Sequence, residues 1–151
     1  ALPNTALFTI EESVPFFRYI KDNQYFYIDK QGFIYSQAEL QRKIILPVLT
    51  GFKIEEGTKR INFAEEMQLF IRNLEEYIRE EAAVPKFIEF KKRKVTLKYE
   101  GKYDIILGEL EDISEKFRVL KNVTDQIEQK DYQVKYVDIS IYSKPVLKLK
   151  Q

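Results

Sequence analysis

Paired carboxylates are the residues of this chain whose type and spacing come closest to a catalytic pattern. Two carboxyl groups that share one site can hold their pKa values apart and act as general acid and base. Adjacent residues of a strand point to opposite faces, however, and the helical pairs fall mostly on the polar side of a predicted helix. No other catalytic group accompanies them, so we interpret them as solvated surface. The pairs are Glu11-Glu12, Glu65-Glu66, Glu75-Glu76 and Glu80-Glu81.

Composition argues against the commonest catalytic and metal-binding sites. The 151 residues include no His and no Cys, which removes the usual general base near neutral pH and every thiolate ligand. The five glycines form no phosphate-binding loop. Asp29 lacks the repeated acidic spacing of a calcium loop and is expected to shape a hairpin turn before Gly32. We therefore predict a protein that is not an enzyme and that uses no cofactor and no metal ion.

The charge balance excludes a general attraction to polyanions. Twenty-five basic residues face twenty-four acidic ones, so no long-range field favours nucleic acid or an anionic membrane. One local exception is Lys91-Lys92-Arg93-Lys94 between Phe90 and Tyr99. The run falls between two predicted strands, which favours a solvated turn. The alternative is that the turn, through Arg93, holds an acidic protein partner; we predict no nucleic-acid partner.

Hydrophobic periodicity predicts two amphipathic helices. The first follows a capping-box-like pair, Asn62 and Glu65, and ends before Pro85. The second runs from about Glu109 to Lys130. Each apolar stripe needs a surface to cover, so we predict an α+β fold with a mostly antiparallel sheet and both helices packed on one face.

Alternating and branched apolar residues predict the strands of that sheet. The loop Lys30-Gln31-Gly32 is typical of a hairpin, and Pro47 favours a short edge strand or a buried loop for its segment. The predicted strands cover residues 5–12, 14–20, 25–29, 33–35, 44–50, 87–90, 95–99, 103–107, 132–142 and 146–150.

The C-terminal hairpin is the candidate binding element. Its turn is predicted at 143–145, and in its last strand Leu147 and Leu149 alternate with Lys148 and Lys150. A final strand can be a sheet edge whose unpaired N–H and C=O groups accept another chain. The lysines can equally be simple edge protection, and both interpretations stay open. The side chains that face outward are not determined, because Pro145 can shift the register by one residue.

Several segments, taken in order, resemble the FtsQ/DivIB family of bacterial cell-division proteins over almost the whole chain. Each is short, and their order and spacing carry the resemblance. They are Leu2-Pro3-Asn4-Thr5 with residues 10–15, the hairpin from Tyr27 to Tyr35, Ile45-Leu46-Pro47-Val48-Leu49-Thr50-Gly51, the strand from Tyr103 to Gly108, and Tyr136-Val137-Asp138-Ile139-Ser140-Ile141 followed by Pro145-Val146-Leu147.

The resemblance implies a domain division and a location. Residues 1–12 would be the final strand of a truncated POTRA-like domain, and residues 13–151 the extracytoplasmic β domain. A short cytoplasmic tail, one transmembrane helix and most of the POTRA domain would precede Ala1. The protein would thus be a single-pass protein of the cytoplasmic membrane, with this domain on the extracytoplasmic side.

The resemblance also implies a function, that of a non-enzymatic divisome scaffold that binds FtsB/DivIC and FtsL during septum formation. The predicted partner-binding residues are Ile141, Ser143, Lys144, Val146, Leu147, Leu149 and Arg93. The hairpin departs from the family pattern at three places: Ser140 stands where Arg is frequent, Ile141 where an aromatic residue is common, and Lys144-Pro145 replaces a more glycine-like turn.

Two other functions were weighed. A secretion or outer-membrane assembly module that captures peptides by strand addition would be distinguished by repeated POTRA domains or a barrel. A carboxylate-dependent hydrolase would require two carboxylates that converge in one cleft.

Overall fold

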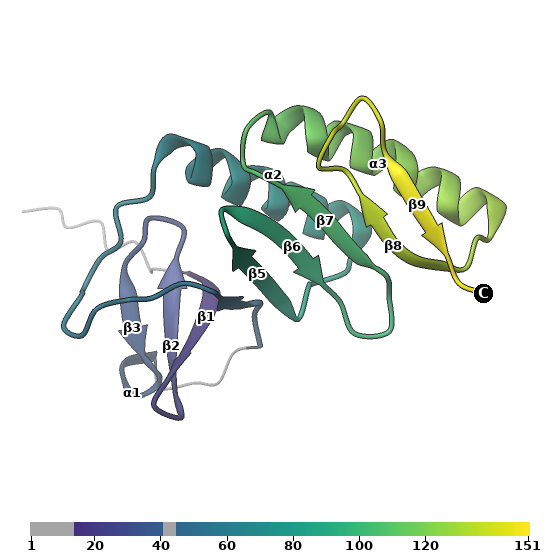
Figure 1. Ribbon diagram of the computed structural model, residues 1–151. Helices are drawn as coiled ribbons and strands as arrows, with labels where there is room; N and C mark the ends of the chain where they lie inside the picture. Colours follow the sequence, from purple (N-terminus) through teal and green to yellow (C-terminus); the bar gives the residue numbers. More distant parts are fainter. Residues whose placement is uncertain (1–13, 41–44) are drawn as a thin grey trace, which may run out of the picture.

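The computed structural model describes residues 14–40 and 45–151 of the chain. Within them one sheet forms, in the order β3-β2-β1-β4-β5-β6-β7-β8-β9 (Figure 1). The strand predicted over 5–12 lies outside the described residues. The elements are β1 (Pro15–Lys21), β2 (Gln24–Asp29), β3 (Ile34–Ser36), α1 (Gln37–Leu40), β4 (Val48–Thr50), α2 (Glu65–Glu81), β5 (Phe87–Lys91), β6 (Lys94–Lys98), β7 (Asp104–Gly108), α3 (Ile113–Lys130), β8 (Val134–Asp138) and β9 (Val146–Leu149).

The sheet is mostly antiparallel, and the predicted α+β fold is confirmed. Five of its eight neighbouring strand pairs are antiparallel, and the exceptions are β1 with β4, β4 with β5, and β7 with β8. Parallel neighbours need a crossover connection, and α2 and α3 supply two of them. Both crossovers run in the same direction along the sheet. Because such connections are right-handed, both helices lie on the same face (Figure 1).

The core lies between that face and the two helices. Strand residues that point to the helices are fully buried, among them Ile88, Leu97, Ile105 and Val137, whereas alternate residues on the other face stay half-buried. The helices contribute Met67, Phe70, Ile71, Leu74 and Tyr77 from α2 and Ile113, Phe117, Leu120, Val123 and Ile127 from α3.

Aromatic contacts fasten α2 to α3. The Phe117 ring centroid lies 6.3 Å from that of Phe70 and 5.8 Å from that of Tyr77. The Tyr77 hydroxyl is 3.1 Å from Thr124 Oγ1, a hydrogen bond inside the core. Burial raises the pKa of Tyr77, so its phenol stays protonated and available for that bond.

Both predicted helix starts are corrected. The N-cap of α2 is Ala64, which makes no side-chain cap hydrogen bond, so the capping box at Asn62 and Glu65 is wrong. The second helix begins at Ile113 and not near Glu109, because Asp112 has a left-handed φ of 52° that interrupts the helical backbone.

A reciprocal capping box does occur, at the short helix α1, which the sequence analysis missed. The backbone N–H of Ser36 donates to Glu39 Oε2, and the backbone N–H of Glu39 donates to Ser36 Oγ, both at 3.2 Å. This is the S-x-x-E pattern, which satisfies two donors that a helix start leaves unpaired.

The segment around Pro47 is also corrected, since β4 lies in the middle of the sheet and not at an edge. Pro47 precedes the strand, so its missing N–H is not needed in the ladder. Its carbonyl accepts from the Arg18 N–H (2.8 Å), and the Val48 N–H donates to the Lys86 carbonyl (3.0 Å). The strand therefore pairs on both sides.

The hairpin between β2 and β3 is confirmed, and Asp29 shapes its turn as predicted. Asp29 Oδ1 accepts from the backbone N–H groups of Gln31 (3.0 Å) and Phe33 (2.9 Å). These bonds satisfy amides that the turn would otherwise leave free.

The β3 edge of the sheet is covered by the chain itself. The Ile34 N–H donates to the Lys59 carbonyl (3.0 Å), and the Ile61 N–H donates to the Gly32 carbonyl (2.8 Å). Gly32 has a φ of +93°, and a Cβ there would come within 1.9 Å of the Ile61 oxygen. The close approach therefore requires glycine, and it closes this edge to other chains.

We predict that truncating either buried ring of the helix layer destabilises the domain. Phe70→Ala and Phe117→Ala should each lower the free energy of unfolding by about 3–5 kcal/mol, because both side chains are buried and would leave a cavity. Urea unfolding measures the change.

Phe33→Ala is the matched control, since that ring is 40% exposed. Phe33→Ala should lower the free energy of unfolding clearly less than Phe70→Ala or Phe117→Ala does. Equal losses at all three positions would contradict the placement of the core.

Candidate protein-binding edge

The opposite edge of the sheet is β9, and the described part of the chain places no strand beside it (Figure 1). β9 pairs with β8 alone, antiparallel, with Leu147 opposite the buried Val137. Leu147 packs against the core. Its side chain therefore faces the helices, and those of Val146 and Lys148 face the open side of the sheet.

The pairing also shows which backbone groups are unpaired. The Lys150 N–H donates to the Gln133 carbonyl at 2.8 Å, so Lys150 turns its backbone toward β8. Backbone direction alternates along a strand, so Lys148 does the same, whereas Leu147 and Leu149 direct their N–H and C=O groups outward. This settles the register that the sequence left open.

The turn that joins β8 to β9 is longer than predicted. β8 ends at Asp138 and not at Tyr142. Asp138 Oδ1 accepts from the Ser140 backbone N–H (2.9 Å) and hydroxyl (2.5 Å), a local turn that competes with the strand ladder. Residues 139–145 form the connection, in which the Lys144 N–H donates to the Ile141 carbonyl at 2.9 Å.

Close contacts hold this turn to the body of the domain. The Ile139 N–H donates to the Ile106 carbonyl at 2.8 Å. Gly108 has a φ of +72°, and a Cβ there would lie 2.6 Å from the Ser140 Cβ. A side chain at 108 would displace the turn, so the hairpin is held at a fixed position.

Lys116 is a buried residue that the sequence analysis missed. It lies on the apolar face of α3 between Ile113 and Phe117, is 2% exposed, and donates to the Glu109 carbonyl at 2.6 Å. Burial lowers the pKa of its ammonium, while the carboxylates of Glu111 and Asp112 oppose that shift. The sequence signal that could have identified this residue is a lysine within the apolar stripe of a predicted helix.

Four exposed apolar side chains lie in the β8–β9 hairpin. Ile141, Tyr142, Val146 and Leu149 are 61%, 36%, 52% and 47% exposed. Adjacent exposed apolar residues are typical of interaction surfaces. Lys144, Lys148 and Lys150 are exposed among them. Tyr142 was not among the predicted residues, although it belongs to this surface.

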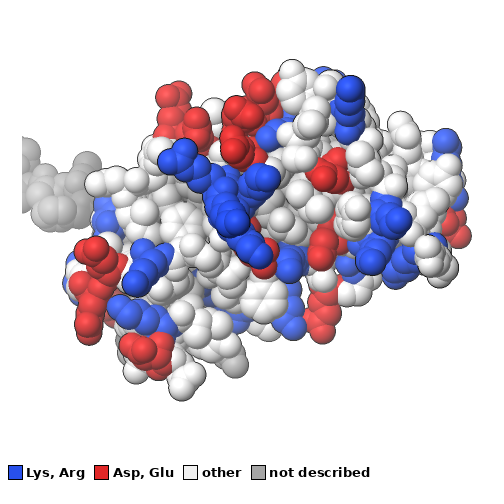
Figure 2. All heavy atoms as spheres, viewed as in Figure 1, with Lys and Arg blue, Asp and Glu red and all other residues white. Residues whose placement is uncertain are grey.

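Arg93 lies apart from the other predicted residues. It is exposed in the β5–β6 turn, where Figure 2 shows basic side chains gathered. That turn is at the same end of the sheet as the β8–β9 turn, but β7 and β8 lie between β6 and β9. Arg93 borders a hollow that is also lined by Phe90, Leu110, Glu109 and Glu111. The structure thus brings six of the seven predicted residues together and leaves Arg93 outside.

The backbone of the β5–β6 turn is strained. Lys92 and Arg93 have φ values of 50° and 66°, the left-handed region in which residues other than Gly, Asn and Asp are uncommon. The β1–β2 turn has the same arrangement at Asp22 and Asn23, with φ values of 51° and 61°. Asp and Asn tolerate that conformation better.

Three of the paired carboxylates of α2, namely Glu75, Glu76 and Glu80, form ion pairs. Glu75 Oε2 lies 2.8 Å from Lys30 Nζ, and Glu76 and Glu80 both contact Lys121 Nζ, at 3.3 and 2.9 Å. The hydrogen bond from Lys121 lowers the pKa of Glu80. Burial raises the pKa of its neighbour Glu81.

No group of three or more His, Cys, Asp or Glu in residues 14–40 and 45–151 is placed to hold a metal ion. No helix in those ranges is long and apolar enough to span a bilayer.

Comparison with known proteins identifies the family. The family model described as "Cell division protein FtsQ/DivIB, C-terminal" matches residues 18–140, from within β1 to the first residues after β8. Curated proteins give no match. The family consists of membrane-associated, non-enzymatic cell-division proteins. On this match, which covers most of the sequence and every strand from β1 to β8, the chain belongs to the FtsQ/DivIB family and carries its C-terminal domain.

Proposed function

We propose that this domain is a non-enzymatic scaffold of the divisome, which binds FtsB/DivIC-type and FtsL-type proteins outside the cytoplasmic membrane during septum formation. The family match supports a role in cell division and favours it over secretion or outer-membrane assembly. The main support for the proposed binding site is that the β9 edge is uncovered and has exposed apolar side chains around it.

The proposed mode of binding is strand addition to β9. Of the two edges of the sheet, β3 is hydrogen-bonded by residues 59–61, and β9 has outward backbone groups at Leu147 and Leu149. A partner strand would satisfy these groups and extend the sheet. Exposed apolar side chains at Ile141, Val146 and Leu149 would supply contact area beside the added strand.

The departures of the hairpin from the family pattern do not oppose this mode. Backbone hydrogen bonds are largely indifferent to side-chain identity. Ser140 completes the turn at Asp138, and Ser143, Lys144 and Pro145 are exposed in the connection before β9. Substitutions there tune the affinity of the edge and leave its geometry in place.

Arg93 is proposed as a separate contact for an acidic part of the partner. The left-handed backbone at Lys92 and Arg93 costs about 1–3 kcal/mol per residue. Stability alone therefore gives no reason for Lys and Arg at these two positions. Basic side chains at this end of the sheet would raise the rate of association with an acidic surface.

The proposal includes the membrane arrangement. Residues 1–12 would complete a POTRA-like domain, residues 13–151 would form the β domain, and an N-terminal helix outside this chain would anchor the protein in the cytoplasmic membrane. Edge binding would then occur between neighbouring anchored proteins, where a modest affinity per contact suffices.

The first prediction of this proposal compares two proline substitutions in β9. Leu147→Pro removes an outward N–H and should weaken binding of an FtsB/DivIC-type partner by about tenfold, the loss of one hydrogen bond. Lys148→Pro removes an N–H directed at β8 and should chiefly lower stability. Calorimetry gives the binding constant, and urea unfolding gives the stability.

Leu147→Ala is the control, because it removes the same side chain and keeps the N–H. It should bind more tightly than Leu147→Pro at comparable stability. If Leu147→Pro is folded and binds as well as Leu147→Ala, the partner does not add a strand here.

The second prediction concerns Arg93. Arg93→Glu should slow association with the partner at low salt and reduce the salt dependence of the rate. Arg93→Gly should slow association less and should stabilise the domain by about 1 kcal/mol, since glycine relieves the left-handed strain. Stopped-flow kinetics and urea unfolding provide the measurements.

Lys21→Glu makes the same change of charge at the β1–β2 turn and serves as the control. If Arg93→Glu slows association no more than Lys21→Glu does, Arg93 is not part of the binding site.

A further inference from the structure

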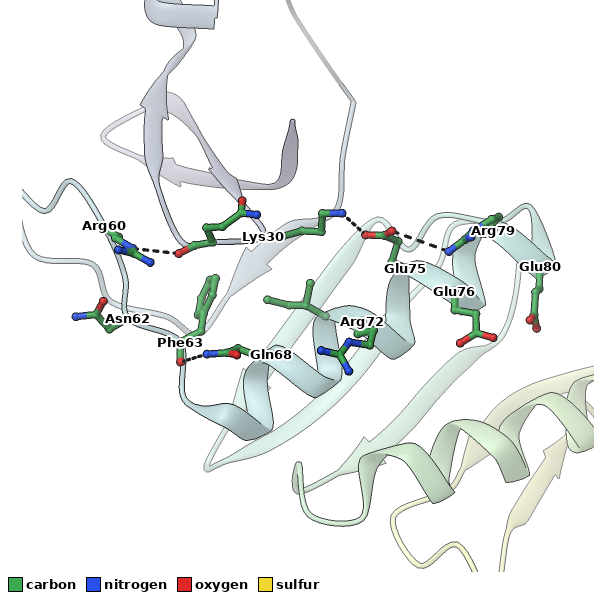
Figure 3. A pocket seen from close by; sticks show the side chains of 12 residues that line it. Lys30, Arg60, Asn62, Phe63, Gln68, Arg72, Glu75, Glu76, Arg79 and Glu80 are labelled. Carbon is green, nitrogen blue, oxygen red and sulfur yellow. Dashed lines mark hydrogen bonds and ion pairs between the residues drawn. The ribbon is translucent and has the colours of Figure 1, made fainter. Parts of the chain in front are cut away.

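A second hollow, remote from β9, lies between α2 and the turn that joins β2 to β3. It measures about 690 Å³ and follows α2 from Gln68 to Glu80 (Figure 3). Its other wall comes from the β2–β3 turn and from residues 60–63. β3 and β9 are the opposite ends of the sheet, so this hollow is separate from the proposed strand-addition edge.

The acidic side chains of this groove are already neutralised by the chain. Glu75 contacts Lys30 at 2.8 Å and Arg79 at 3.9 Å. Glu76 and Glu80 share the ammonium of Lys121, which approaches from α3. An incoming ligand therefore finds no unpaired carboxylate along this side of α2.

Two arginines of the groove are not neutralised. Arg60 donates from Nε to the Gln31 carbonyl at 3.3 Å, and its guanidinium lies 4.7 Å from the centre of the Phe33 ring. These contacts fix the side chain and leave its terminal nitrogens available. Arg72 is exposed on α2. Neither arginine forms an ion pair with a carboxylate of the described chain.

The floor of the groove is suited to a peptide. Phe63, which is half-buried, and the buried Ile71 also line the groove. Gln68 donates from Nε2 to the Phe63 carbonyl at 2.9 Å, which fixes its side-chain amide. A site that combines apolar side chains with a few fixed polar groups favours a polypeptide over a polymer that carries only charge.

We propose that this groove binds an acidic, partly apolar segment of a partner protein, which lies along α2 with its carboxylates on Arg60 and Arg72. Guanidinium groups bind carboxylates through paired hydrogen bonds. The stretch from Gln68 to Glu80 rises about 18 Å along the helix, a length that an extended segment of about six residues spans. The domain would thus hold two segments at once, one at β9 and one on α2.

The test uses a defined probe, a fluorescein-labelled peptide of about eight residues in which Glu alternates with Leu. Fluorescence anisotropy at low salt measures its binding to the full chain. The double variant Arg60→Glu, Arg72→Glu should weaken binding by about tenfold or more, because each substitution replaces attraction with repulsion.

Two controls separate the groove from general charge. The double variant Lys53→Glu, Lys130→Glu changes the net charge equally at exposed positions outside the groove and should bind the probe almost as the parent chain does. A probe with Gln in place of Glu should bind poorly. Equal losses in the two double variants, or unchanged binding of the Gln probe, would overturn the proposal.

Competition with inorganic polyphosphate distinguishes a peptide-binding groove from a phosphate-binding one. If polyphosphate displaces the probe and binds more tightly through the same two arginines, the site is one for phosphate polymers and the peptide proposal fails. Binding of an FtsB/DivIC-type partner to β9 should not change in the groove variant, so failure here and failure at the edge are distinguishable.

Discussion

The constraint on which the rest of the structure depends is the hand of its two helical crossovers. β4, β5, β7 and β8 are parallel to one another, and α2 and α3 connect them in the same direction along the sheet. Right-handed connections then place both helices on one face. From β1 to β9 the strands after β3 are added to the sheet in chain order. The last strand of the chain therefore becomes the last strand of the sheet.

The near-neutral total charge conceals this organisation. Exposed basic residues gather around β9, at the β5–β6 turn and at Arg60 and Arg72 of the α2 groove, whereas three of the six glutamates of α2 form ion pairs within the chain. A net charge of +1 excludes a general affinity for polyanions. It does not exclude local sites, because a charge acts on a partner over about 8 Å in physiological salt.

The local sequence pattern predicted those features that depend on interactions between residues close together in the chain. The α+β class, the two helix stripes and the hairpin turn at Asp29 follow from periodicity and turn chemistry, and all three are found. The central place of β4 could not be predicted, because Pro47 falls just outside the ladder. At the candidate site, the sequence predicted which side chains of the C-terminal hairpin would bind a partner, and that stays a prediction. Their register was not predicted, since it depends on how β9 pairs with β8.

Two tight hairpin turns in the described part of the chain differ in the residues that occupy them. Both place two consecutive residues in the left-handed region, and both need the same backbone to join twisted antiparallel strands. At Asp22 and Asn23 the residues are among those that tolerate this backbone, and at Lys92 and Arg93 they are not. Since the fold accepts the favoured residues at one turn, the geometry does not demand basic ones at the other. The β5–β6 turn is therefore the more strained of the two, although both turns have the same backbone geometry.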